Sequence, residues 1–241
     1  MSKRNKLQKF ADILSYPNVL ENFDAKNPCL VGKDGMLVER KGAWAEKQFG
    51  NNKPITLELA CGKGDYTIGL ARMYPDRNFI GVDIKGARIW KGATLALEEN
   101  LENVAFFRTR IEQIAYFFEP GEVAEIWITF PDPFLRNSKA NRRLTAVNFL
   151  KHYSKILKRD GIIHLKTDSP ELYNFTLETL EETDLATLLY NKDDIYSDDL
   201  YLPELELKTF YEQMHLENGL TIKYIQMRLE KTLDGSISES E

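Results

Sequence analysis

Short apolar segments alternate along the chain with segments whose apolar residues recur at helical spacing. The apolar segments contain little polar alternation, which is typical of strands that helices cover on both faces. These expected strands cover residues 55–60, 78–83, 103–109, 121–130 and 161–168. Strands that alternate with helices predict an α/β fold with a doubly wound, mostly parallel, Rossmann-like sheet.

Helices are predicted where apolar residues recur three and four positions apart. They cover residues 6–15, 65–75, 85–100, 111–118, 142–161 and 169–182. Gly161 is expected to end the fifth of these helices, and Ser169 and Pro170 to begin the sixth. A last strand at 219–230 contains interspersed polar residues, which indicates an antiparallel or edge position in a sheet of about seven strands.

Length and composition set the expected domain organisation. The 241-residue chain is long enough for one domain, which we expect over 51–230, with 1–50 packed on it as an N-terminal extension. The polar tail 231–241 is expected to be disordered, and the acidic stretch 181–217 to be a solvated, partly flexible loop.

The sequence also indicates where the protein works. No apolar run approaches the roughly 20 residues of a membrane span, and the N-terminal residues lack the pattern of a secretory signal. Two cysteines are too few for a disulfide scaffold or a metal cage, and the histidines lack ligand spacing. We therefore expect a cytoplasmic protein without a membrane partner and without a metal.

Charge is distributed unevenly along the chain. The formal net charge of −5 argues against a globally basic nucleic-acid-binding protein. Eight basic residues and no acidic residue, however, lie between Arg136 and Arg159. A helix face that is merely solvated usually mixes both signs, so this basic segment favours contact with a phosphate backbone. Lys139, Arg142 and Arg143 are the candidates for those contacts.

Two glycines and two acids mark the ends of the first two strands. Gly62 and Gly64 lie in the turn after the strand that contains Glu58, and Asp83 ends the second strand. Glycines let a ligand approach the backbone, and an acid about 20 residues further on accepts hydrogen bonds from a ribose diol. A buried strand rarely carries an unpaired acid, which singles out Glu58. Because the pyrophosphate fingerprint is incomplete, S-adenosylmethionine fits this pattern better than a dinucleotide.

Asp132 lies between two prolines in the loop after the fourth strand. The prolines restrict the backbone, so the loop holds this carboxylate at a defined point, as a catalytic group requires. The alternative, for an isolated Asp-Pro pair, is a structural turn with the aspartate as a capping acceptor. Ligands of open α/β sheets bind outside the carboxyl ends of the strands, so we expect Glu58, Asp83 and Asp132 in one cleft.

With these motifs in place, the chain resembles the bacterial tRNA (guanine-N7)-methyltransferases, a family of class I S-adenosylmethionine-dependent methyltransferases. The resemblance covers about Pro54 to Leu229 and rests on LELACGKG, FIGVD, FPDPF followed by NRRLT, LKTD and TFYE, in this order. It implies methyl transfer from S-adenosylmethionine to N7 of a guanine in the variable loop of tRNA. The products are 7-methylguanosine and S-adenosylhomocysteine. No obligate protein partner is evident, and both a monomer and a homodimer remain open.

The resemblance also implies roles for individual residues. Catalysis is implied for Asp132, and cofactor contacts for Glu58, Gly62, Gly64, Asp83, Arg110 and Asp132. Substrate contacts are implied for Arg136, Asp168, Thr209, Phe210, Tyr211 and Glu212. Guanine N7 carries a free lone pair and the product ring is cationic, so Asp132 is expected to orient the guanine and stabilise its charge rather than to act as a strong base.

The chain departs from the family pattern at several positions. Ala60 replaces the first glycine of the cofactor motif, which suggests a backbone without positive φ at that point. Arg110 stands where the family often has an aspartate, Phe134-Leu135 replace Trp-Pro, and the basic run is thinner. Two other functions therefore remain open. A methyltransferase acting on the exocyclic amine of adenine is disfavoured by the missing second proline, and a non-catalytic RNA-binding protein by the intact acids.

Overall fold

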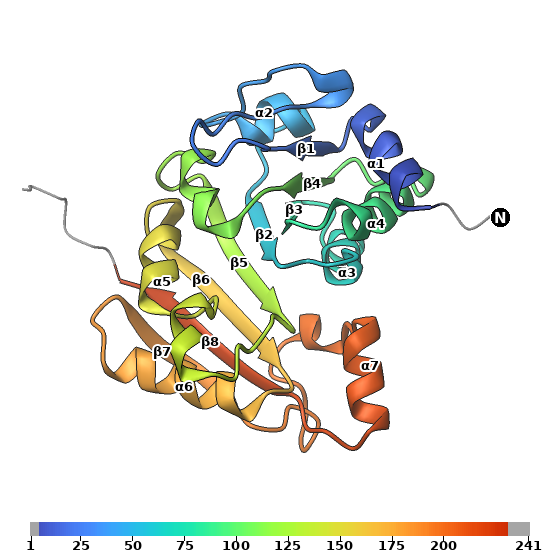
Figure 1. Ribbon diagram of the computed structural model, residues 1–241. Helices are drawn as coiled ribbons and strands as arrows, with labels where there is room; N and C mark the ends of the chain where they lie inside the picture. Colours follow the sequence, from blue (N-terminus) through green and yellow to red (C-terminus); the bar gives the residue numbers. More distant parts are fainter. Residues whose placement is uncertain (1–4, 231–241) are drawn as a thin grey trace, which may run out of the picture.

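Eight strands form one sheet within residues 5–230, the part of the chain that the computed structural model describes (Figure 1). Their order across the sheet is β1-β4-β3-β2-β5-β6-β8-β7. The strands are β1 (Val19–Glu21), β2 (Ile55–Leu59), β3 (Asn78–Asp83), β4 (Val104–Arg108), β5 (Val123–Thr129), β6 (Leu157–Thr167), β7 (Ala186–Lys192) and β8 (Lys223–Leu229). The first six pair in parallel, whereas β8 runs antiparallel to β6 and β7. The predicted α/β fold with a mostly parallel sheet is confirmed.

Helices cover both faces of the sheet, each over its own apolar cluster. On one face lie α1 (Lys6–Ser15), α3 (Asp65–Met73) and α4 (Gly86–Glu98). On the other lie α2 (Trp44–Phe49), η2 (Ile111–Tyr116), α5 (Val147–Tyr153) and α6 (Pro170–Glu181). Ser169 caps α6 as predicted, because its Oγ accepts a hydrogen bond from Leu172 N at 3.2 Å and Pro170 follows as the first helical residue.

The eighth strand comes from the N-terminal segment. β1 is three residues long and pairs in parallel with β4, opposite Phe106–Arg108. The prediction of about seven strands missed it, because three residues are too few to show a strand period. α1 packs on α4 beside it. The predicted disordered tail at 231–241 lies outside the described residues.

The predicted helix at 142–161 is wrong over most of its length. Its residues lie at the end of the 3₁₀ helix η3 (Asn137–Arg142), in α5, and from Leu157 onward in β6. The register between β5 and β6 shifts just after Leu157, and Asp160 within this bulge has φ of 63°. A Cβ on Gly161 would lie 2.8 Å from the Leu157 side chain. Gly161 therefore allows close packing inside a bulged strand and does not end a helix.

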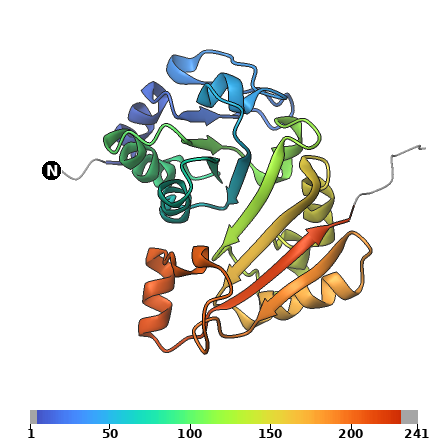
Figure 2. The same ribbon diagram turned by 180° about the vertical axis from the view of Figure 1, so that it is seen from behind.

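The acidic stretch 181–217 is more ordered than predicted. It contains β7, the 3₁₀ helix η4 (Pro203–Glu206) and α7 (Phe210–Glu217). Figures 1 and 2 show α7 beside the carboxyl ends of β5 and β6. Leu205 of η4 is fully buried on the sheet, so this segment is part of the fold and lies next to the edge where ligands of such sheets bind.

Candidate active site

Two adjoining cavities lie at the carboxyl ends of the parallel strands. The larger has a volume of about 540 Å³, and the predicted residues in its lining are Asp83, Arg110, Asp132 and Arg142. The smaller has a volume of about 50 Å³, and the predicted residues in its lining are Glu58, Gly62, Thr209 and Tyr211. Both are lined by Ala60, Arg88 and Phe130. The fold thus brings eight of the predicted residues to one edge of the sheet.

Glu58 is a buried acid of β2 whose oxygens accept several hydrogen bonds. Thr67 donates from its backbone N at 2.8 Å and also from Oγ1, and Thr129 Oγ1 donates at 2.7 Å. Burial raises the pKa of Glu58 to about 7, although these hydrogen bonds oppose the shift. A nearby cationic group stabilises the charged form of such a carboxyl. The site therefore suits a ligand that carries a positive charge.

The turn after β2 has a left-handed backbone at three residues. The angle φ is 60° at Ala60, 57° at Gly62 and 74° at Gly64. The prediction that Ala60 avoids positive φ is therefore wrong. This conformation costs a residue with a Cβ atom about 1–2 kcal/mol. Ala60 adopts it because the surrounding turn fixes the backbone there. Gly64 is also required for packing, since a Cβ there would lie 2.5 Å from the Phe106 ring.

Asp83 fixes this turn from the end of β3. Its Oδ2 accepts from Gly62 N at 2.9 Å and its Oδ1 from Lys85 N at 2.8 Å. Each carboxylate oxygen can accept more than one hydrogen bond, so Asp83 can also accept hydrogen bonds from the hydroxyl groups of a ligand in the cavity. Arg110, at the end of the next strand, is exposed and precedes η2.

Asp132 is exposed in the loop after β5, between two residues with unusual backbone angles. Phe130 has φ of 48° and Phe134 has φ of 42°, in the region that residues other than glycine rarely adopt. Phe130 N donates to Lys166 O at 2.8 Å, and Phe134 N donates to Asp132 Oδ1 at 3.0 Å. These hydrogen bonds hold the carboxylate at one point on the lining of the larger cavity.

The basic segment is divided between the two ends of the sheet. Arg136, Lys139 and Arg142 are exposed in or next to η3, near the cavity. Arg143 is buried, and its guanidinium donates to the carbonyl oxygens of Pro133 and Phe134. Lys158 and Arg159 belong to the bulge at the opposite, amino end of β6, far along the strand from the cavity.

The sequence places Lys166 among the strand-end residues but assigns it no role, although a lysine inside the apolar strand IIHLKTD is as unusual as Glu58 in its own strand. Its side chain is 0% exposed, and Nζ donates to Leu205 O at 3.0 Å and to Leu207 O at 2.9 Å. Nζ also pairs with Glu212 Oε1 at 2.8 Å. Burial lowers the pKa of Lys166 to about 8, against the opposing charge of Glu212. One ammonium thus ties η4 and α7 to the sheet.

Glu212 consequently lies outside the cavity lining. It is fully buried, and besides Lys166 it accepts a hydrogen bond from Tyr196 Oη at 2.7 Å. Thr209 caps α7 by accepting from Glu212 N at 3.1 Å through Oγ1. Tyr211, in the first turn of α7, reaches the smaller cavity with Thr209. Within the TFYE motif, Thr209 and Tyr211 therefore line the smaller cavity, whereas Glu212 is buried and holds α7 to β6 through Lys166.

The other predicted substrate residues lie near this edge but outside the lining of the two cavities. Asp168 follows β6 and is half-buried, with Oδ2 at 3.6 Å from Nδ1 of His215. His215 belongs to α7 and stacks on Phe130 at a centroid distance of 6.1 Å. Phe210 is exposed, with Lys63 Nζ at 4.5 Å from its ring centroid. His215 had no ligand spacing in the sequence that could have identified it.

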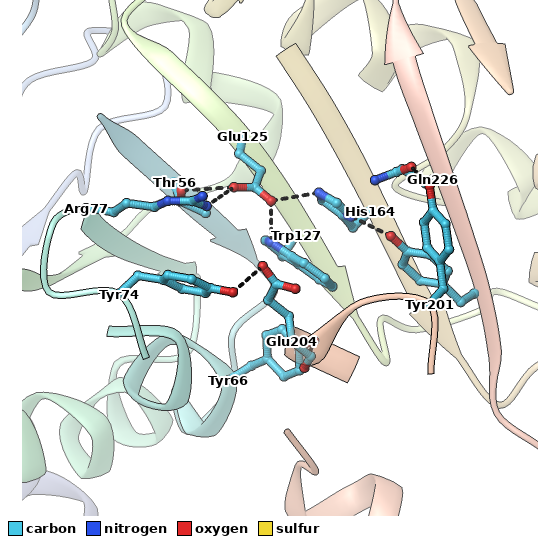
Figure 3. Close-up of polar contacts among 11 residues, drawn as sticks. Thr56, Tyr66, Tyr74, Arg77, Glu125, Trp127, His164, Tyr201, Glu204 and Gln226 are labelled. Atoms are coloured by element: carbon cyan, nitrogen blue, oxygen red, sulfur yellow. Dashed lines mark hydrogen bonds and ion pairs between the residues drawn. The ribbon is translucent and has the colours of Figure 1, made fainter. Parts of the chain in front are cut away.

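A second, partly buried polar network lies on the face of the sheet that α3 covers (Figure 3). Glu125 is at its centre, with Arg77 Nη1 at 3.1 Å and His164 Nε2 at 2.7 Å. Burial alone would raise the pKa of Glu125, but the hydrogen bond and charge of His164 and the charge of Arg77 hold it below its usual value. Beside it, Glu204 of η4 accepts from Tyr74 Oη at 2.8 Å. The Tyr74–Glu204 contact links η4 to the end of α3.

Residues 5–230 contain neither a candidate metal-ion site nor a helix suited to crossing a membrane. No group of three or more His, Cys, Asp or Glu side chains there is placed to hold a metal ion. None of the helices in that range has the length and apolar character needed to cross a membrane.

Comparison with known proteins first defines the class. A family profile described as "Putative methyltransferase" matches residues 52–225. The solved structure of the 16S rRNA methyltransferase KamB has a TM-score of 0.57 at 14% identity, over 81% of this chain and 96% of that chain. The 16S rRNA (adenine(1408)-N(1))-methyltransferase from Catenulisporales acidiphilia has a TM-score of 0.52 at 14% identity, over 83% and 96%. The chain is a methyltransferase with the class I fold.

Curated relatives then define the family. The tRNA (guanine-N(7)-)-methyltransferase of Bacteroides thetaiotaomicron is 50% identical over 227 residues, which are 94% of this chain and 86% of the relative. The protein of the same name from Christiangramia forsetii is 47% identical over 230 residues, 95% of this chain and 100% of the relative. This chain belongs to the tRNA (guanine-N7)-methyltransferase family.

Proposed function

We propose that this protein transfers a methyl group from S-adenosylmethionine to N7 of a guanine in the variable loop of tRNA, in the cytoplasm. Besides family membership, the position of Asp132 supports this function. Asp132 is exposed on the lining of the cavity that also contains Asp83 and Arg110, and the exposed cations Arg136, Lys139 and Arg142 follow it directly. A carboxylate that can stabilise a cationic purine ring thus lies next to a basic surface that can bind the phosphates of RNA.

The residues at the two cavities fit S-adenosylmethionine. Glu58 is a buried acid with a raised pKa beside the smaller cavity, which suits the ammonium of the methionine part. Asp83 lies at the larger cavity at the end of β3, where an acid can accept from ribose hydroxyls. The left-handed turn at Gly62 leaves open space where a Cβ would stand, so a ligand can approach the backbone.

The chemistry requires positioning more than proton transfer. The guanine N7 lone pair forms a bond to the methyl carbon as the carbon–sulfur bond breaks, and the sulfur keeps the bonding pair as a neutral thioether. The positive charge passes from the sulfonium to the purine ring, and no proton needs to leave before attack. Asp132 stabilises the ring charge that grows in the transition state and orients the base.

Recognition of guanine falls to residues around α7. Asp168 is half-buried at the end of β6 and can accept from the N1–H and N2 amine of guanine, an edge that adenine does not offer. Thr209 and Tyr211 line the smaller cavity and can contact the same base. Glu212, which is buried and paired with Lys166, supports these residues from beneath.

Nucleoside analysis of tRNA after incubation with the purified protein and S-adenosylmethionine tests the proposal. We expect 7-methylguanosine, mapped to the variable loop. N6-methyladenosine without 7-methylguanosine would identify the adenine-modifying alternative. No methylation, together with no S-adenosylmethionine binding by calorimetry, would favour a non-catalytic RNA-binding protein.

A further inference from the structure

Arg142 and Arg143 are adjacent in sequence but face different surroundings. Arg142 is exposed and lines the larger cavity, with its guanidinium 5.0 Å from the Phe134 ring centroid. Arg143 is 5% exposed, and its guanidinium lies 4.4 Å from the ring centroid of Phe175 in α6. The neighbouring arginines therefore cannot serve the same purpose, although both belong to the basic segment.

The polar atoms of Arg143 are directed at the loop that holds Asp132. Nε donates to Pro133 O at 3.0 Å and Nη2 donates to Phe134 O at 3.1 Å. Hydrogen bonds from a charged guanidinium are stronger than those between neutral groups, and the planar guanidinium sets the direction of both. Arg143 thus binds two successive carbonyl groups directly after Asp132.

One peptide unit connects Arg143 to Asp132. The carbonyl of Pro133 accepts from Arg143 Nε, and the N–H on the other side of the same planar unit, at Phe134, donates to Asp132 Oδ1 at 3.0 Å. Rotation of this unit would break both hydrogen bonds together. The direction of the Asp132 carboxylate therefore depends on a guanidinium that is itself buried in the protein interior.

The loop needs such support because its backbone is strained. Phe130 and Phe134 both have positive φ, and such conformations persist only where surrounding residues fix them. Proline rings at 131 and 133 restrict φ at those two positions and the backbone of the residue before each, but they do not restrict Phe134. Arg143 binds the loop at its strained carboxyl end, at Phe134.

We propose that Arg143 is a positioning residue for Asp132, and that its part in the reaction is to fix this loop rather than to bind a tRNA phosphate. The inference rests on the proposed function, since it assigns a role within that reaction. It separates two residues that the basic segment presents as equivalent. Arg142 remains available to RNA, whereas Arg143 acts from inside the fold.

The test compares Arg143→Met, Arg143→Lys and Arg142→Met with the wild-type chain. Arg159→Met, in the exposed bulge at the far end of β6, controls for the loss of one positive charge. For each protein we would measure kcat and KM for tRNA, the slope of log affinity for tRNA against log salt, and S-adenosylhomocysteine affinity by calorimetry. Circular dichroism would show whether each variant is folded.

Arg143→Met should lower kcat by about 100-fold, the size expected when a reacting group is misplaced by about an ångström. Its salt slope and its S-adenosylhomocysteine affinity should equal those of the wild type. Arg143→Lys should recover part of kcat, since an ammonium can still donate to one carbonyl. Arg142→Met should instead raise KM and reduce the salt slope by about one. Arg159→Met should match the wild type throughout.

Two results would overturn the inference. One is an Arg143→Met enzyme with wild-type kcat at saturating tRNA and a reduced salt slope, which would make Arg143 a phosphate ligand. The other applies if Arg143→Met does not fold: a folded Arg143→Lys enzyme with unchanged kcat would show that the two hydrogen bonds do not position Asp132. Absence of 7-methylguanosine with the wild-type chain would refute the proposed function instead, so the two failures are distinguishable.

Discussion

Glu58 and Asp132 are two acids of one site in opposite surroundings. Glu58 is buried beneath the smaller cavity and its pKa is raised to about 7, whereas Asp132 is exposed beside the larger one. A buried acid responds to the charge of its ligand, whereas an exposed acid in a stiff loop is held at a defined point beside the reacting base. The two carboxyls therefore suit different tasks, one in binding the methyl donor and one in the transfer.

The raised pKa of Glu58 predicts pH-dependent binding of the methyl donor or its product. The folded-state pKa of about 7 exceeds the usual 4.5, so in the ligand-free protein this group favours folding at low pH, and that contribution is lost as pH rises from about 4.5 to about 7. An ammonium ligand prefers the carboxylate form. Affinity for S-adenosylhomocysteine should therefore rise toward pH 7 and then level off, with proton release on binding below pH 7.

Calorimetry in buffers of different ionisation enthalpy would measure this proton release. Glu58→Gln should bind more weakly and lose the pH dependence, because its amide does not titrate in this range. Equal wild-type affinity at about pH 5.5 and about pH 8 would contradict the role of Glu58 as the ammonium partner.

At the scale of elements, strands and helices with a regular spacing of apolar residues can be predicted from the sequence. Features that depend on contacts with distant parts of the chain cannot. Apolar spacing identified the main parallel strands, and the Ser169–Pro170 start of α6 was correct. The sequence alone predicts a helix end at Asp160–Gly161. It does not reveal the bulge there, because the bulge arises from the pairing of β6 with β5, which is distant along the chain. In the site, acids at strand ends are identifiable from the sequence, whereas the burial of Arg143 and Glu212 depends on contacts with Phe175 of α6 and Lys166 of β6, which are distant along the chain.

The η4–α7 segment depends on one buried ion pair. Replacing Lys166 by Met leaves the Glu212 carboxylate buried without its cation, so we expect a loss of about 3–5 kcal/mol in the free energy of unfolding. The double variant Lys166→Met/Glu212→Gln removes both charges and should recover part of that loss. Urea unfolding of the wild type, both single variants and the double variant measures the coupling. A single Lys166→Met variant within about 1 kcal/mol of the wild type would show that the pair does not anchor the segment.

For the whole molecule, an acidic protein must bind an acidic nucleic acid through a local surface. The net charge is −5, and Arg136, Lys139 and Arg142 are exposed near the Asp132 cavity. Neutralising these three should reduce the salt slope of tRNA binding by about one for each phosphate that they bind. Neutralising Lys151, Lys155 and Arg159, which are exposed on α5 and beyond it, serves as the matched control. Equal effects of the two triple variants would mean that tRNA responds only to overall charge.

Formation of 7-methylguanosine by wild-type and Asp132→Asn enzymes would show directly whether Asp132 acts in methyl transfer. Single-turnover assays with saturating S-adenosylmethionine and tRNA measure transfer itself, and a parallel binding assay measures tRNA affinity. We predict that the wild type forms 7-methylguanosine, and that Asp132→Asn slows its formation by about 100- to 1,000-fold while tRNA affinity stays close to the wild-type value. Equal rates for the two enzymes would show that Asp132 has no part in methyl transfer.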